Sequence, residues 1–310
     1  MTNSPSSADA ARASAASAAT RDPLSEPLPP VEITFLGAGL FILFTWLLRS
    51  VRRGGLRAAL RLDSIETFPP PPFGPEIVLV PFIWYVALQA MLAQAAAWQG
   101  LDTEPDGNAP LGLTLAINAV GQITTSALIL LLVRSARGGT LRGWGVSPRG
   151  AAADAGRGIL VYLAIWPIVS ATAWGTLLLV RQVSPGAELP LHTTLNLLND
   201  AKASPLLHAA AFISAGLLAP LFEELYFRGV LLDGLARAAG SRGTAVAATA
   251  MLFALMHTQT WQFMPALFVL GIVLGWLYAR RRSMVAVVAL HAAFNLKTLI
   301  LALYDPVPAA

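Results

Sequence analysis

Two adjacent carboxylates and an arginine interrupt an apolar stretch of the sequence: Glu223, Glu224 and Arg228 lie within the run LFEELYFRG. On a helix, Glu224 and Arg228 are four residues apart and can form an ion pair, whereas Glu223 points about 100° away from Glu224. One carboxylate is then neutralised and the other stays free. A free carboxylate among apolar residues is suited to take a proton from water as a general base. A simpler interpretation places the three charges at a helix end, where solvent covers them.

Two histidines and an asparagine add polar groups to later apolar runs. His257 ends the run of residues 251–256, with Phe253 one turn before it, and His291 lies inside the last run with Asn295 one turn after it. A single histidine in such a run commonly forms only a hydrogen bond between helices. Three segments that each keep a costly polar residue are more simply explained by one shared buried site.

Helices that cross a membrane have to position these residues. Of the 310 residues, 55% are hydrophobic and 12% are charged, and the mean hydropathy is +0.62, which excludes a water-soluble protein of this length. The absence of cysteine excludes disulfides, thiolate nucleophiles and cysteine-bound metals. The net charge of +4 does not indicate nucleic-acid binding, because the arginines lie where a membrane protein needs them.

The hydropathy pattern predicts an all-α fold, a polytopic integral membrane helical bundle of about eight transmembrane helices. The expected spans cover residues 33–48, 77–98, 111–133, 158–180, 205–222, 243–257, 265–279 and 284–304. The sixth and seventh spans are short. We expect neighbouring helices to shield them, their polar ends to extend them, or the chain to re-enter the side from which it came.

Basic residues support this count because they gather in every second loop, as in cytoplasmic loops of membrane proteins. The first, third, fifth and seventh loops contain most of the 21 lysines and arginines, whereas the second loop contains Asp102, Glu104 and Asp106 and no base. Both termini are therefore expected outside, in the plasma membrane if the source is prokaryotic.

Four further polar residues receive no role in the expected site. We expect His192 in a loop, His208 at a helix start, Asp233 on a polar helix face, and the side chain of Lys297 extended toward the membrane surface.

Taken in sequence order, three motifs resemble those of the CAAX prenyl protease 2 type intramembrane proteases, also called the CPBP or Abi family. They are EExxxR (Glu223, Glu224, Arg228), FxxxH (Phe253, His257) and HxxxN (His291, Asn295). The resemblance covers about residues 205–300, and no motif position departs from it. It implies an intramembrane endopeptidase acting on a membrane-embedded or lipid-anchored protein, including a prenylated, CAAX-like one.

The resemblance also implies a role for each motif residue. Glu223 is the general base, His257 holds and polarises the water, and His291 with Asn295 donates hydrogen bonds to the oxyanion. Glu224 and Arg228 fix the helix and orient Glu223. We favour this route without a metal.

Zinc is the alternative, with Glu223, His257 and His291 as its ligands. That arrangement would leave only Glu224 as a base and would deprive Arg228 of its partner. Cofactor dependence therefore stays open at this stage.

Three regions are expected along the chain. Residues 1–30, rich in Ala, Ser and Pro, form a disordered tail without the apolar core of a signal peptide. Residues 31–200 form N-terminal transmembrane helices and loops, with Pro69 to Pro72 as a stiff connector. Residues 201–310 form the CPBP-like catalytic helical core.

Two other functions remain open beside the protease. A non-catalytic membrane scaffold or bacteriocin-immunity-type protein would keep the polar cluster for packing. A small ion-coupled transporter could also use buried carboxylates and histidines, although the sequence shows no internal repeat of the kind common in transporters. The expected partners are the lipid bilayer and a membrane-associated substrate.

Overall fold

The computed structural model describes residues 30–52, 74–101, 108–139, 143–146, 149–185 and 204–304, together with positions 55, 60, 141, 187, 189, 194 and 198. The expected tail up to residue 29, the proline connector at residues 69–72 and His192 lie outside the described residues.

Every regular element within the described residues is a helix. The elements are α2 (Pro30–Arg52), α4 (Pro75–Trp98), α5 (Asn108–Ala136), α6 (Ala151–Val183), α8 (Pro205–Ile213), the π-helix η1 (Ser214–Leu218), α9 (Ala219–Glu224), the π-helix η2 (Leu225–Leu231), α10 (Leu232–Ala239), α11 (Arg242–Leu255), the 3-10 helix η3 (Thr258–Phe263), α12 (Met264–Arg281) and α13 (Met284–Tyr304).

Seven helical segments of the described chain are long and apolar enough to cross a membrane, and α11 is a shorter apolar helix. The protein is thus a polytopic helical membrane protein, as the hydropathy pattern predicts. With 14 residues, α11 is about 21 Å long, less than the roughly 30 Å of a hydrocarbon core. The seventh expected span is longer than the sequence indicates, because η3 adds a polar end and extends it to residues 258–281.

The fifth span differs from the expectation in its length. The segments from α8 to α10 follow one another without a break from Pro205 to Ala239, whereas the sequence predicts an end at residue 222. The Ser204 side chain accepts a hydrogen bond from the backbone N–H of Leu207 at the start, and Gly240, with a φ of 62°, ends the run. The carboxylates and the arginine therefore lie inside this helix and not at its end.

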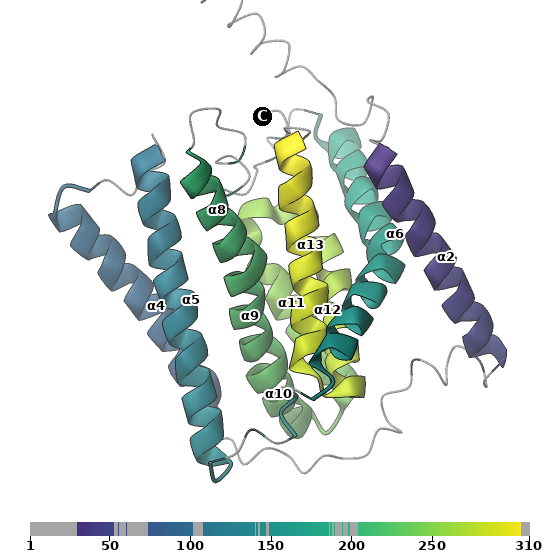
Figure 1. Ribbon diagram of the computed structural model, residues 1–310, viewed down its shortest axis with the longest axis horizontal. Coiled ribbons are helices and arrows are strands. Elements are labelled where there is room, and N and C mark those ends of the chain that lie inside the picture. Colours follow the sequence, from purple (N-terminus) through teal and green to yellow (C-terminus); the bar gives the residue numbers. More distant parts are fainter. Residues whose placement is uncertain are drawn as a thin grey trace, which may run out of the picture.

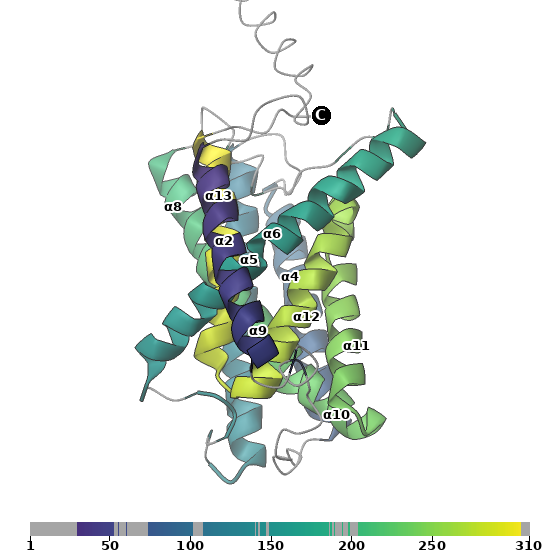
Figure 2. The ribbon, with the colours of Figure 1, turned by 90° about the vertical axis from the view of Figure 1, so that its right-hand side faces the viewer.

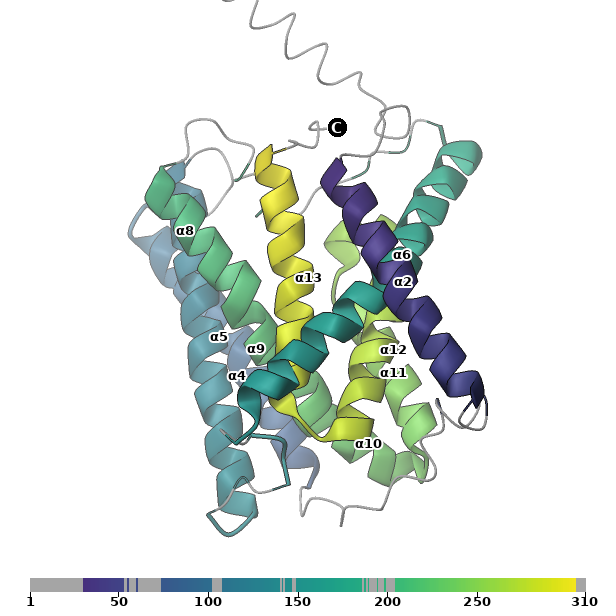
Figure 3. The ribbon, with the colours of Figure 1, turned by 45° about the vertical axis from the view of Figure 1, so that its right-hand side comes forward.

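The bundle is arranged around α13 (Figure 1). In that view α11 and α12 lie behind α13, α4 and α5 lie beside the α8 to α10 run, and α2 lies on the far side against α6. Figures 2 and 3 show that α6 crosses the bundle obliquely. Its 33 residues make about 50 Å of helix, so it fits a bilayer only when it is tilted.

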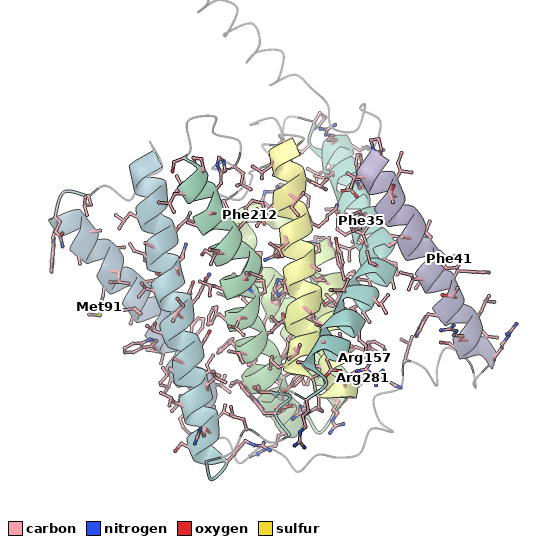
Figure 4. The ribbon with its side chains drawn as sticks, in the orientation of Figure 1. Phe35, Phe41, Met91, Arg157, Phe212 and Arg281 are labelled. Atoms are coloured by element: carbon pink, nitrogen blue, oxygen red, sulfur yellow. The ribbon has the colours of Figure 1, made fainter. Side chains whose placement is uncertain are left out.

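Apolar side chains fill the centre of the bundle and also cover its outer surface. The centre contains fully buried residues of α12 and α13, among them Leu270, Tyr278 and Leu290. On the outside, Phe41 is 69% exposed and Met91 is 68% exposed, and Figure 4 shows both directed away from the bundle. A surface of this kind is suited to contact with lipid chains.

Candidate active site

The carboxylates lie on α9, a short α-helical segment with a π-helix on either side. A π-helix widens the helical turn and is often found at functional sites. Two carbonyl groups in these widened turns accept hydrogen bonds from other parts of the chain. The side-chain amide of Asn295 donates to the Ala215 oxygen in η1 at 2.8 Å, and the indole N–H of Trp144 donates to the Gly229 oxygen in η2 at 2.8 Å.

Glu224 is fully buried, and two cationic or polar partners hold one of its oxygens. Arg228, also fully buried, donates from Nη1 to Glu224 Oε1 at 2.8 Å, which is the pair predicted from their spacing. Nδ1 of His291 donates to the same oxygen at 2.8 Å. Arg228 also donates to the Gly271 carbonyl on α12 at 3.3 Å. These contacts join the α9 region to α12 and α13 at membrane depth.

Glu223 is in a different environment, although it is the next residue. Its side chain is 20% exposed, and its Oε2 atom is buried and has no hydrogen-bond partner among the described residues. The atom lies 3.7 Å from Nε2 of His291, beyond hydrogen-bonding distance. One water molecule could contact both atoms. Oε2 of Glu224 is likewise buried without a partner in the described chain, but Glu224 is fully buried and paired with Arg228, so Glu223 is the more accessible of the two carboxylates.

Phe253 brings the two histidines toward the same place. Its buried ring contacts the imidazole of His257, with centroids 4.9 Å apart, and that of His291, at 5.5 Å. The guanidinium of Arg228 lies 4.8 Å from the centre of the same ring, which favours a cation-π contact. The motif position Phe253 therefore packs against three of the polar residues.

His257 lies where α11 has ended and η3 begins. Its Nδ1 donates to the Phe253 carbonyl at 2.8 Å, because a carbonyl oxygen can only accept. In the neutral ring, Nε2 is then left as an acceptor. This irregular segment begins the candidate span of residues 258–281, and within a membrane such backbone is tolerated next to protein or a water-filled cavity.

The expected metal ligands do not form a ligand group in the structure. Among the described residues, no three His, Asp or Glu side chains are close enough together to hold one metal ion. Glu223 and His291 are neighbours, but His257 does not join them as a third ligand. The described residues therefore do not form the zinc site that the alternative requires.

Asn295 and Lys297 have contacts that the sequence did not indicate. One N–H of the Asn295 amide is used for the Ala215 carbonyl, so at most the second is available to an oxyanion. Lys297 does not extend toward the membrane surface. It is 8% exposed, pairs with Glu32 on α2 and lies 3.4 Å from the ring centre of Trp166.

Asp233 is likewise more than part of a polar face. It is buried and forms two hydrogen bonds with Arg282, at 2.5 and 2.8 Å. Burial without a partner would be costly for either charge, so the pair stabilises the junction between α10 and the turn that joins α12 to α13.

The comparisons with known proteins agree with the motifs. Residues 205–297 match the family model of the Type II CAAX prenyl endopeptidases, described as Rce1-like. Over residues 205–297 the chain is thus similar to this family of prenyl endopeptidases, and the resemblance inferred from the three motifs is confirmed over this range.

A relative with a curated description is the UPF0177 protein YxdF of Lactococcus lactis subsp. lactis (strain IL1403). It is 30% identical to this chain over 82 residues, which are 26% of this chain and 44% of YxdF. The chain thus matches less than half the length of that relative. No solved structure matches the chain.

Proposed function

We propose that the protein is an intramembrane endopeptidase in which Glu223 activates a water molecule for attack on a peptide bond. The observation that carries this proposal is the different use of the two neighbouring carboxylates. Arg228 and His291 both bind Oε1 of Glu224, which is fully buried, while Glu223 is 20% exposed and its Oε2 lies 3.7 Å from His291. Oε2 of both carboxylates is buried without a partner in the described chain, so the difference lies in the ion pair and the exposure. The Rce1-like domain over residues 205–297 supports the same class of activity.

In the proposed reaction, Glu223 takes a proton from water as the oxygen attacks the carbonyl carbon of the substrate. The tetrahedral intermediate carries a negative oxygen, which needs hydrogen-bond donors. His291, when protonated, offers Nε2–H, and Asn295 offers its second amide hydrogen. Glu223 then passes the proton to the leaving nitrogen as the C–N bond breaks. His257 accepts a hydrogen bond from the water through Nε2.

The proposed substrate is a membrane-embedded or lipid-anchored protein, with prenylated, CAAX-like C termini as one candidate class. Two observations support this class. The site lies among helices long and apolar enough to span a membrane, a position suited to a substrate that is itself held in the membrane. The matching family model is that of prenyl endopeptidases.

The decisive experiment compares the N and C termini of membrane proteins from cells expressing the wild type or Glu223→Gln at equal abundance. The substitution keeps the shape of the side chain and removes the base, so precursors are expected to accumulate only with the variant. The positions of the lost cuts would identify the substrate class. If the variant is folded and the membrane-protein termini are the same in both samples, the result would contradict the proposed protease activity and favour a non-catalytic scaffold.

A further inference from the structure

One tryptophan outside the three motifs anchors the segment between α5 and α6 in the bundle. Trp144 is the largest fully buried side chain among the described residues. It lies between Gly143 and Gly145, in the stretch that joins the end of α5 at Ala136 to the start of α6 at Ala151. A buried tryptophan is unusual in such a segment, because connecting segments normally lie on the surface.

The indole of Trp144 lies against the π-helix η2. Its N–H donates to the Gly229 carbonyl at 2.8 Å in a buried hydrogen bond. A Cβ added to Gly229 would lie 2.3 Å from Cζ2 of the indole, closer than two such carbon atoms can approach. The ring therefore fills the space that glycine leaves open, and it is in direct contact with the backbone of η2.

The backbone around Trp144 is held in turn by α12 and the start of α13. Three consecutive carbonyl groups, those of residues 143–145, each accept a hydrogen bond from that region. The donors are the Arg282 guanidinium at 3.4 Å, the Tyr278 hydroxyl at 3.1 Å and the Met284 amide at 2.9 Å. The main chain of Trp144 is thus fixed on two core helices while its side chain reaches the π-helix.

This contact bears on the candidate active site because Gly229 directly follows Arg228. Both residues belong to the widened turns of residues 225–231. Arg228 donates to Glu224 at 2.8 Å, and Glu224 directly follows the proposed base Glu223. A displacement of the Gly229 carbonyl would therefore displace the guanidinium and, through the ion pair, both carboxylates.

The segment α9, which carries the carboxylates, is held on both flanks by side chains from distant parts of the chain. Before it, Asn295 donates to the Ala215 carbonyl in η1, and after it, Trp144 donates to the Gly229 carbonyl in η2. Asn295 belongs to one of the three motifs, whereas Trp144 belongs to none. The second flank therefore depends on a residue that the motifs do not include.

The position of a π-turn determines where the carboxylates of α9 point. A π-turn closes over one residue more than an α-turn, so a residue that a migrating π-turn passes is rotated by about 100° around the helix axis. This is also the angle between neighbouring residues such as Glu223 and Glu224. Migration of η2 into α9 would therefore turn Glu223 away from His291, and a donor that holds the wide turn at Gly229 opposes this migration.

We propose that Trp144 is a positioning residue of the endopeptidase, which holds the wide turn of η2 in place and thereby directs Glu223 at the attacking water. The effect passes from the Gly229 carbonyl through Arg228 and Glu224. This inference rests on the proposed function and adds a residue from outside the matched range. Loss of the indole N–H should lower the turnover number and leave substrate binding intact, because Trp144 acts on the base.

The test replaces Trp144 by benzothienylalanine in the full chain, in lipid nanodiscs. This amino acid keeps two fused rings and carries sulfur in place of the N–H, so the hydrogen-bond donor alone is lost. The substrate is a peptide copied from a precursor that accumulates with Glu223→Gln in the comparison of membrane-protein termini. The matched control is the same replacement at Trp166, which is 8% exposed and donates from its N–H to Glu32 on α2 at 3.2 Å.

The replacement at Trp144 is expected to lower kcat per folded protein by about 10- to 100-fold, the range that a displacement of catalytic groups by about 1 Å can cause. KM should stay within about twofold, so that kcat and kcat/KM fall together. The replacement at Trp166 should change neither constant. A merely structural role would lower the unfolding temperature and the yield but not kcat per folded molecule. Unchanged kcat, or a rise in KM alone, would overturn the inference.

A second variant decides if the replacement at Trp144 does not fold. Tyr278→Phe removes the hydroxyl that donates to the Trp144 carbonyl and leaves the indole in place. It should lower kcat by about 3-fold, the effect of one modest hydrogen bond, and an unchanged kcat would contradict the inference. If no precursor accumulates with Glu223→Gln, the proposed function fails and the inference with it. If the wild type cleaves and the variants match it, the inference alone fails.

Discussion

Glu223 and Glu224 have the same side chain and adjacent positions, but they differ in what surrounds them. Glu224 is fully buried and its Oε1 is bonded by Arg228 and His291, whereas the Glu223 side chain is 20% exposed and has no ion pair with arginine or lysine among the described residues. Two neighbouring carboxylates in different environments can serve different purposes, one as part of the framework and one as a base. The same chemical change should therefore have opposite consequences at the two positions.

Glu224→Gln is expected to lower the free energy of unfolding by about 3–5 kcal/mol, because Arg228 stays buried without a counter-charge. Glu223→Gln is the matched control and should leave stability nearly unchanged while abolishing cleavage. Thermal unfolding of both purified variants in detergent measures the difference. Equal unfolding temperatures would show that Glu224 has no framework role.

The sequence was sufficient for the local part of the site and insufficient for the rest. The spacing of Glu224 and Arg228 predicts their pair, because residues four apart face each other on one helix turn. The contact of His291 with Glu224 spans 67 positions, and helix periodicity carries no information on how two distant helices are packed. For the same reason neither the stacking of Tyr85 on Phe222, which precedes Glu223, nor the hydrogen bond from Trp144 to Gly229 was expected.

At the level of the elements, most helices follow the hydropathy pattern, while the exceptions have a physical cause. The fifth span continues to Ala239, because Arg228 and Glu224 neutralise each other inside the bundle and Asp233 pairs with Arg282. A hydropathy average counts these residues as free charges and ends the span before them. Two carbonyl groups in the π-helical turns accept hydrogen bonds from Trp144 and Asn295, which are contacts between distant segments that hydropathy does not describe.

The crossing of α6 and α13 depends on a missing side chain. A Cβ at Gly158 would lie 2.1 Å from the carbonyl oxygen of Ala286, so the two helix backbones are in direct contact. Gly158→Ala is expected to force α13 away, to destabilise the protein by about 1–3 kcal/mol and to reduce cleavage by displacing His291. Gly156→Ala is the control, because nothing lies within 4 Å of that position. The unfolding temperature and the cleavage activity are measured for both variants. Equal values for Gly158→Ala and Gly156→Ala would contradict the close contact between α6 and α13.

For the whole molecule, the pairing of Glu32 with Lys297 places the start of α2 and the last turns of α13 at the same end of the bundle (Figure 1). Arg157 and Arg281, which belong to two loops expected in the cytoplasm, lie together at the opposite end (Figure 4). Because cytoplasmic ends collect basic residues, we propose that this arginine-bearing end faces the cytoplasm and that both termini face outward.

The absence of native cysteine allows a direct test of this orientation. Gln99→Cys, after α4, should react with a membrane-impermeant maleimide in intact cells. Ala238→Cys, near the end of α10, should react only after the cells are permeabilised. Both positions are exposed, so accessibility within the fold does not distinguish them. The reverse labelling pattern would show that the orientation is inverted.

The contact between Glu32 and Lys297 also has a consequence in time. The two residues are 265 positions apart, and ribosomes add about 5–20 residues per second, so roughly 13–50 s separate the synthesis of the carboxylate from that of its cation. Throughout that interval the first membrane helix carries an acidic group that lacks its final counter-ion. A nascent chain that stops before α13 lacks Lys297, so its Glu32 has no counter-ion. The charge state of the first helix therefore depends on whether the last helix has been synthesised.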